Sequence, residues 1–220
     1  MQKFATPAPI AAVLDVPAGR VQFIAADRTD TTVEVRPTDP AKNRDVRTAE
    51  QTTVTCADGF LTIRTAPAGH TLFGAGSLEI TVQLPAGSAA EARTEACELR
   101  VVGRLGDLAF TGAHRQIKID EAASVRLTAI DGDIEIGRLT GPATLDTARG
   151  DIRVAEATRG TVTLATQSGD ITVNAAPGVS AALDAATGHG RISNALRNDG
   201  TTTLAIRATT PHGDITARSL

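Results

Sequence analysis

A three-residue step recurs through the second half of this 220-residue chain and constrains the fold more than any other feature. The step is glycine, then usually aspartate, then an aliphatic residue; its copies begin at Gly106, Gly132, Gly150, Gly169, Gly190 and Gly213, at intervals of 26, 18, 19, 21 and 23 residues. A period near 20 residues is typical of parallel β-solenoids, in which one coil holds two or three short strands. The sequence therefore predicts an all-β fold: a single-stranded, right-handed parallel β-solenoid (β-helix) with about 20 residues per coil.

Aligned on the glycine, the copies produce columns of apolar side chains. The position two residues after the glycine is isoleucine in five copies, and the positions five and seven residues before it are aliphatic. Even offsets on either side of a turn are expected of inward-pointing positions on two strands. The resulting core is narrow, which accounts for a chain without tryptophan or tyrosine. The predicted structural repeat comprises Gly132, Asp133, Ile134, Gly150, Asp151, Ile152, Gly169, Asp170, Ile171, Gly190, Ile192, Gly213, Asp214 and Ile215.

The glycine and aspartate columns need separate physical explanations. The glycine is expected at a turn with positive φ, where a Cβ would be strained. Stacked carboxylates repel by roughly 1 kcal/mol per adjacent pair in water, so we expect each to accept a hydrogen bond from a turn N–H group. Arg149, Arg153 and Arg191 could also neutralise the row. A calcium-binding stack is the alternative, but calcium repeats place Gly and Asp about every nine residues.

The column immediately before the glycine carries the only candidate catalytic side chains. It contains Asp131, Arg149, Ser168, His189 and His212. The alignment predicts that His189 and His212 lie one coil apart, with Ser168 next to His189. A Ser–His pair could serve a nucleophile and two imidazoles a metal, whereas the simpler interpretation is a row of solvated turn residues. The other two histidines, His70 and His114, fall in predicted loops. We predict no metal site and no cofactor, since no cofactor-binding motif is present.

The sequence predicts one continuous domain with a more irregular β portion in residues 1–94, which either continues the same coil or forms a small cap on the solenoid, and with the regular coils in residues 95–220. Ala11–Val16 and Arg20–Ile24 read as two strands joined by a turn at Pro17–Gly19. The polar stretch from Pro37 to Gln51 reads as an exposed loop, and no segment sustains a helical period. The C-terminal coil ends at Leu220 without a cap. Because an uncapped coil exposes unpaired backbone groups, we expect self-association through the C-terminal rung.

Composition excludes several classes of protein. The chain has 22 basic and 25 acidic residues, a net charge of -3 and 2% aromatic residues, which argues against nucleic-acid binding. No apolar run is long enough for a signal peptide or a membrane span, so the sequence predicts a cytoplasmic protein, extracellular only if the N-terminus was trimmed. Cys56 and Cys97 lie 41 positions apart; they are expected as buried free thiols, with a disulfide between them as the alternative.

Several motifs in order resemble a known family. Val16–Gly19, Asp58–Ile63 and Val82–Gly87 precede the repeated Gly-Asp-Ile steps. From about Val13 to Thr216 the chain is similar to the bacterial "putative adhesin" β-strand-repeat family, a domain of unknown function common in actinobacteria. The resemblance implies a β-solenoid and supplies no catalytic residues. The sequence therefore predicts a non-enzymatic scaffold or a binding module, adhesin-like, for a protein or a surface. The alternative is an enzyme (a hydrolase, lyase or cyclase) that uses polar residues on one solenoid face.

Overall fold

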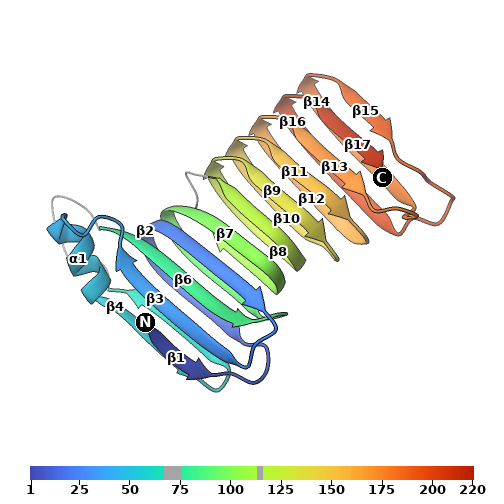
Figure 1. Cartoon of the computed structure of the whole chain (residues 1–220). Coiled ribbons are helices and arrows are strands. Elements are labelled where there is room, and N and C mark those ends of the chain that lie inside the picture. The colour runs from blue at the N-terminus through green and yellow to red at the C-terminus, as the bar shows by residue number, and fades with distance from the viewer. Residues whose placement is uncertain (67–75, 113–115) are drawn as a thin grey trace.

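Strands cross the long axis of the molecule one after another, like the rungs of a ladder (Figure 1). The structure, a computed structural model, describes residues 1–66, 76–112 and 116–220. His70 and His114, which the sequence assigns to loops, lie outside these ranges. The prediction of an all-β fold is confirmed, because nearly every described element is a strand.

Strand follows strand along the described chain, with a helix among them. The N-terminal part contains β1 (Gln2–Ala5), β2 (Ala11–Ala26), β3 (Asp30–Pro37), α1 (Asn43–Glu50), β4 (Thr52–Ala57), β5 (Phe60–Thr65) and β6 (Ser77–Pro85). The middle contains β7 (Ala89–Thr111), β8 (Ile117–Asp131), β9 (Ile134–Leu139), β10 (Ala143–Arg149) and β11 (Ile152–Ala157). The C-terminal part contains β12 (Gly160–Ser168), β13 (Ile171–Ala175), β14 (Ala181–His189), β15 (Ile192–Ala195), β16 (Leu204–His212) and β17 (Ile215–Ser219).

The regular part consists of two lines of parallel strands joined at a glycine corner. The first line contains, in spatial order, β8, β10, β12, β16 and β14, and each strand pairs in parallel with its neighbours. The second line contains, in spatial order, β9, β11, β13, β17 and β15, which also pair in parallel. The chain passes from the first line to the second at each Gly-Asp step, so one strand from each line makes one rung. Where coils follow each other directly, equivalent residues are 18 or 19 positions apart.

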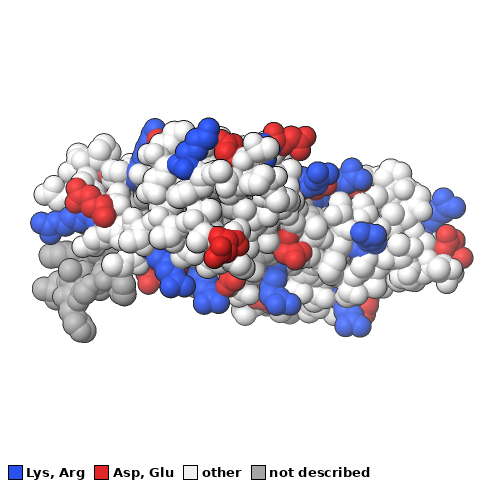
Figure 2. All heavy atoms as spheres, turned by 90° about the horizontal axis from the view of Figure 1, so that it is seen from below, with Lys and Arg blue, Asp and Glu red and all other residues white. Residues whose placement is uncertain are grey.

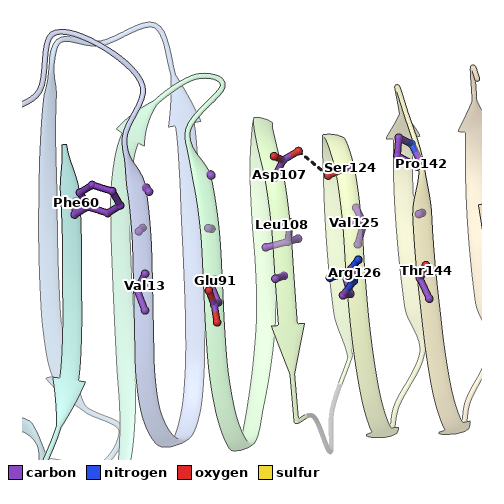
Figure 3. Close-up of a pocket in the computed structure, with 16 residues that line it drawn as sticks. Val13, Phe60, Glu91, Asp107, Leu108, Ser124, Val125, Arg126, Pro142 and Thr144 are labelled. Carbon is purple, nitrogen blue, oxygen red and sulfur yellow. Dashed lines mark hydrogen bonds between the residues drawn. The ribbon is translucent and has the colours of Figure 1, made fainter. Parts of the chain in front are cut away.

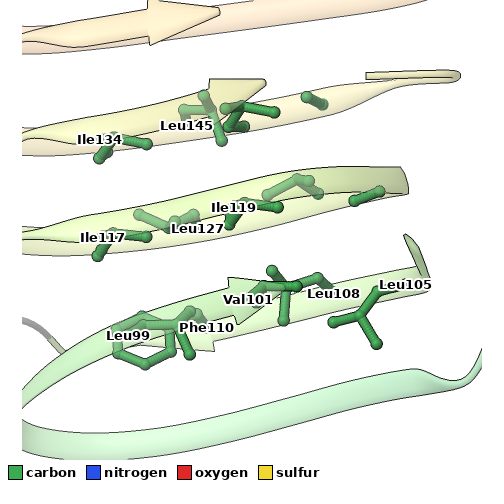
Figure 4. Close-up of a cluster of buried hydrophobic side chains, with 14 of the residues drawn as sticks. Leu99, Val101, Leu105, Leu108, Phe110, Ile117, Ile119, Leu127, Ile134 and Leu145 are labelled. Atoms are coloured by element: carbon green, nitrogen blue, oxygen red, sulfur yellow. The ribbon is translucent and has the colours of Figure 1, made fainter. Parts of the chain in front are cut away.

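One column of aliphatic side chains runs through nine rungs and forms the centre of the core. Register partners connect its members from end to end; in spatial order they are Ile80, Val21, Leu99, Ile117, Ile134, Ile152, Ile171, Ile215 and Ile192. All except the last are at most 1% exposed. Figure 4 shows the middle of this core, where Leu99, Ile117 and Ile134 lie on successive rungs. Burying such a side chain contributes about 1.5–3 kcal/mol, so the column stabilises the N-terminal part and the coils together.

The last two rungs are exchanged in space relative to the chain order. Strand β16 pairs with β12 on one side and β14 on the other, and β17 lies likewise between β13 and β15. The C-terminal rung is therefore internal, and the prediction that it offers an unpaired edge is wrong. The rung of β14 and β15 is the terminal one, with no partner strand beyond it in the described chain (Figure 1). For the same reason Ile192 contacts Ile215 rather than Ile171, and it is 47% exposed.

The first two rungs are exchanged in the same way, and the outer one is covered. Strand β2 pairs with β7 on one side and with β5 and β6 on the other, although β5 and β6 follow it in the chain. Antiparallel strands then cover the outer rung: β4 on β5, β3 on β6, and β1 on β3. The prediction of a purely parallel solenoid is thus wrong at this end. The antiparallel cover leaves the two ends of the ladder chemically different.

The stretch that the sequence assigned to an exposed loop contains a helix. Helix α1 lies against β3, β6 and β4, and its two buried side chains, Asp45 and Thr48, are polar. Asp45, 2% exposed, accepts a hydrogen bond from the Ser77 N–H at 3.0 Å, and the Thr48 hydroxyl oxygen accepts one from Gly76 at 2.9 Å. The prediction was wrong because a helix whose buried face is polar has no apolar period.

Two smaller predictions are also corrected or resolved. The expected turn at Pro17–Gly19 is a corner within the continuous strand β2, with Gly19 at a φ of 130°. Cys56 is half-buried in β4, where burial raises the pKa of its thiol, and Cys97 is buried in β7. No disulfide joins the two, so that alternative is wrong.

Charged side chains of both signs lie close together on the face that Figure 2 shows. Many form ion pairs between neighbouring strands, as Lys118 does with Glu135 at 3.1 Å. In the part of the chain that the structure describes, no helix has the length and apolarity to cross a membrane.

The glycine corner yields a first prediction on stability. A Cβ at Gly169, where φ is 150°, would overlap the carbonyl oxygen of Gly150 on the next rung. Gly169→Ala should lower the free energy of unfolding by about 3 kcal/mol, through backbone strain and overpacking. Gly178 has a φ of 78° and open space around the same position. Gly178→Ala, the matched control, should lose only about 1 kcal/mol in urea unfolding. Equal losses for the two variants would contradict the close stacking of the corners.

The exchanged rung order yields a second prediction. Ile215 is fully buried between two rungs, and Ile192 is half exposed on the terminal one. Ile215→Ala should therefore lower the free energy of unfolding by about 3 kcal/mol, and Ile192→Ala by less than about 1 kcal/mol. If the rungs followed the chain order, Ile215 would be terminal and the ranking in denaturant unfolding would be reversed.

Candidate functional site

The glycine corner brings together the residues that the sequence singled out, and hydrogen bonds between rungs hold it. The carboxylate of Asp133 accepts a hydrogen bond from the Asp151 N–H at 2.9 Å, and Asp151 accepts one from Asp170 at 2.8 Å. Asp170 accepts the Asp214 N–H at 2.7 Å. Each carboxylate thus binds the backbone of the following rung, which offsets the repulsion along the row. One oxygen of each carboxylate is thus committed to the backbone of the neighbouring rung.

The Arg that replaces aspartate at position 191 has a clear role in the exchanged order. Asp214 accepts the Arg191 N–H at 2.8 Å through one oxygen and the Arg191 guanidinium at 3.1 Å through the other. Arg191 lies on the terminal rung, where a carboxylate would have no further N–H group to accept. Of the other two arginines considered for this row, Arg149 pairs instead with Asp131 at 2.9 Å.

Sequence reasoning missed a column of threonines that closes the corner from inside. Thr147, Thr166 and Thr210 are at most 3% exposed, and threonine also occupies the equivalent position 187. The hydroxyl of Thr166 donates to the Gly150 carbonyl at 3.0 Å, and that of Thr210 donates to the Gly169 carbonyl at 3.1 Å. The signal was present in the sequence, because threonine stands three residues before four of the glycines.

The column before the glycine is arranged differently from the expectation. In spatial order it runs Asp131, Arg149, Ser168, His212, His189. His189 and His212 are register partners one rung apart, with ring centroids separated by 5.1 Å and ring planes inclined by 11°. Ser168 neighbours His212 and not His189, because the last coil is inserted between them.

These three side chains do not form a nucleophile and base pair. Ser168, His189 and His212 are all exposed. Within the described residues, no hydrogen bond joins Ser168 to either imidazole, and no carboxylate orients a ring. Activation of a serine requires a base within hydrogen-bond reach that a third group holds in place. Nor do the described residues contain a cluster of three or more potential metal ligands.

The outer side of the first line of strands carries a groove. It has a volume of about 480 Å³ and spans successive rungs from β5 to β10 (Figure 3). Small side chains form its floor, among them Ala11, Ala89 and Ala109. Phe60, which is 60% exposed, stands at one end, as Figure 3 shows. Sequence reasoning missed this groove because its outward alanines lie on strands far apart in the chain.

Polar groups are few in the groove, and one of them is unpaired. Ser124 donates a hydrogen bond to Asp107 at 2.6 Å, and Glu91 pairs with Arg93 at 2.8 Å. Arg126 is exposed and has no ion-pair partner in the described chain. The groove therefore combines an apolar floor, an aromatic ring and one available guanidinium, a composition typical of binding sites.

The fold and the corner define an all-β repeat protein with a solenoid-like stack of rungs. The chain belongs to the Toastrack DUF4097 family, whose model matches residues 13–218. This confirms the resemblance to the "putative adhesin" family. No curated protein matches the chain.

Solved structures are similar to this chain. A "putative adhesin" from Bacteroides fragilis is similar over 98% of this chain and 95% of that chain, with 15% identity and a TM-score of 0.57. A second one, from Parabacteroides merdae, covers 98% and 94%, with 12% identity and a TM-score of 0.46. At 15% identity, the Bacteroides structure shows only that the two proteins share a fold.

The Asp214 site yields a third prediction, on pH. The Arg191 N–H and then the Arg191 guanidinium lower the pKa of the Asp214 carboxyl below its ordinary value. A lowered folded-state pKa contributes stability above the unfolded value of about 3.9, and the contribution is lost as the pH falls through the folded value. We therefore expect the Arg191 amide to lose protection from hydrogen exchange below about pH 4.

Two variants test how the Arg191 guanidinium and the Asp214 carboxyl contribute to this pH dependence. Arg191→Ala should raise the pKa of Asp214 only in part, because the backbone N–H, the larger cause, remains. Asp214→Asn should abolish the acid-dependent loss of protection. The carboxyl is followed by carbon-detected NMR titration. An Asp214 that titrates at its ordinary value in the unmodified protein would refute the contact.

Proposed function

We propose that the protein is a non-enzymatic, adhesin-like binding module that holds its ligand in the groove across the first line of strands. The observation that carries this proposal is the groove itself, with an apolar floor, exposed Phe60 and unpaired Arg126 on a rigid ladder. Binding residues on a rigid scaffold lose little entropy when a ligand docks. The names of the structural neighbours, which describe "putative adhesins", agree with this role.

The ladder geometry supports a ligand that lies across the rungs. Neighbouring rungs are about 4.8 Å apart, so the groove offers equivalent side-chain positions at a regular spacing. Val13, Glu91, Ala109, Arg126 and Thr144 all line it and come from successive passes of the chain. A protein segment or an extended surface polymer fits such a track better than a small compact metabolite does. The enzyme alternative gains no support, since Ser168 and the two histidines form no hydrogen-bonded set.

The finer features of the solenoid belong to the same proposal. We take the regular part as a right-handed parallel coil of about 20 residues per turn, in a bacterial protein of actinobacterial type. The residue spacing of 18 and 19 between stacked aspartates supports the coil length. A cytoplasmic location, or an extracellular one if the N-terminus was trimmed, is retained as a prediction; binding to cell surfaces requires the extracellular case, and fractionation of the native host would distinguish the two.

The fourth prediction tests the groove directly. Ala109→Asp places a carboxylate on the groove floor, on an outward position that leaves the inward core intact. Purified protein on beads should bind whole bacterial cells or immobilised envelope proteins. This variant should reduce binding at least about tenfold, which is about 1.4 kcal/mol, because the new carboxylate faces Arg126, its register partner, and pairs with the guanidinium that the ligand would use.

Two further variants make the result specific. Arg126→Ala should weaken binding without changing the urea midpoint, as its side chain is exposed. Thr172→Asp, on β13 in the second line of strands, adds the same charge away from the groove and should bind like the unmodified protein. Equal binding by all four proteins, or no binding at all, would eliminate the groove as the site.

A further inference from the structure

The stacked histidines lie at the end of the ladder where the outermost strand, β14, has no further partner strand among the described residues. His189 is in β14 on the terminal rung, and His212 is in β16 on the rung beneath. Both side chains are exposed, and glycine flanks His189 on both sides. The two rings are nearly parallel and 5.1 Å apart between centroids. The two histidines belong to consecutive coils, so residues 23 positions apart in the sequence are direct register neighbours, and the exchange of the last two rungs places this pair at the open end of the ladder.

We propose that His189 and His212 form a two-histidine site for a divalent transition metal ion of the Zn²⁺, Ni²⁺ and Cu²⁺ type. Neutral imidazole is a preferred ligand of these ions, with metal–nitrogen distances of about 2.0–2.1 Å. In a tetrahedral complex, two such nitrogens lie about 3.3 Å apart. Small rotations of two exposed side chains on adjacent rungs reach this separation, and the flanking Gly188 and Gly190 present no Cβ to obstruct them.

The surroundings favour a cation. The nearest guanidinium along the strand, that of Arg191, is already paired with Asp214 at 3.1 Å. Arg149, two rungs from His212 in the same column, is paired with Asp131. Ser168, the residue between them, is neutral. No uncompensated positive charge from these neighbours therefore opposes the ion.

The described residues supply two ligands, so water completes the coordination. They include no group of three or more His, Cys, Asp or Glu side chains placed to hold a metal. The ion is consequently exchangeable and less tightly held than a structural zinc, whose four ligands all come from protein. Because only neutral imidazole binds metal, the affinity falls as the solution becomes acidic.

Metal binding at this site also acts on the fold. The ion connects β14 to β16 at the end of the ladder where β14 has no outer partner. A ligand that binds only the folded state stabilises it in proportion to its concentration. Zn²⁺ should therefore slow hydrogen exchange in the β14 amides and leave the β8 and β10 amides unchanged.

The test is titration of the full chain with Zn²⁺ by calorimetry near neutral pH. We expect one ion per chain, and His189→Asn or His212→Asn should each weaken binding by at least about tenfold, since each removes one of two ligands. The matched control replaces His70 and His114 together by asparagine; it removes two imidazoles but keeps the pair, and it should bind like the unmodified protein.

Hydrogen exchange provides the second measurement. Protection of the β14 amides by Zn²⁺ should be present in the unmodified protein and in the control, and absent in both single variants. Circular dichroism confirms that the single variants are folded, as expected for substitutions of exposed residues. Unchanged affinity in the two single variants, or no binding at millimolar Zn²⁺, would overturn the proposal and leave the histidines as a simple ring stack.

Discussion

The approach of backbone to backbone at the glycine corner is the constraint on which the rest of the ladder depends. A Cβ at Gly169 or Gly213 would overlap the carbonyl oxygen of the neighbouring corner glycine. Only glycine lets the corners stack directly, and this stacking brings each aspartate oxygen to the N–H group of the next rung. The same close spacing aligns the isoleucines two residues later into a continuous buried column.

The exchange of rungs at both ends explains how such a ladder terminates. At the C-terminal end β17 is held between two rungs, at the N-terminal end β2 is, and in both cases a segment from further inside the chain forms the outer rung. The two ends differ in their cover, because antiparallel strands and α1 protect one rung, whereas β14 and β15 stay open. The stacked histidines lie at that open end, and the groove lies nearer the covered end.

Much of the regular fold could be predicted from the sequence, because the repeat sets local geometry and burial together. The register of Ile134, Ile152 and Ile171 follows from the spacing of the glycines. Helix α1 and the groove could not be predicted. The helix buries Asp45 and Thr48 in hydrogen bonds rather than apolar side chains, and the groove depends on alanines that different coils contribute.

By itself the sequence determined the corner, the inward column and the all-β class, since these depend on which residue types fit at fixed offsets within one coil. The tertiary structure alone decided the order of the rungs. The local pattern of a parallel rung allows it to pair equally well with either neighbouring rung. The burial of side chains in the whole molecule therefore decides the order of the rungs. The copy with Arg191 and Asn194 tolerates water best and takes the outside position, while the copy with Ile215 and Ala217 is enclosed. That choice, which depends on comparing two whole rungs, places His212 rather than His189 beside Ser168 and leaves His189 on the outer rung.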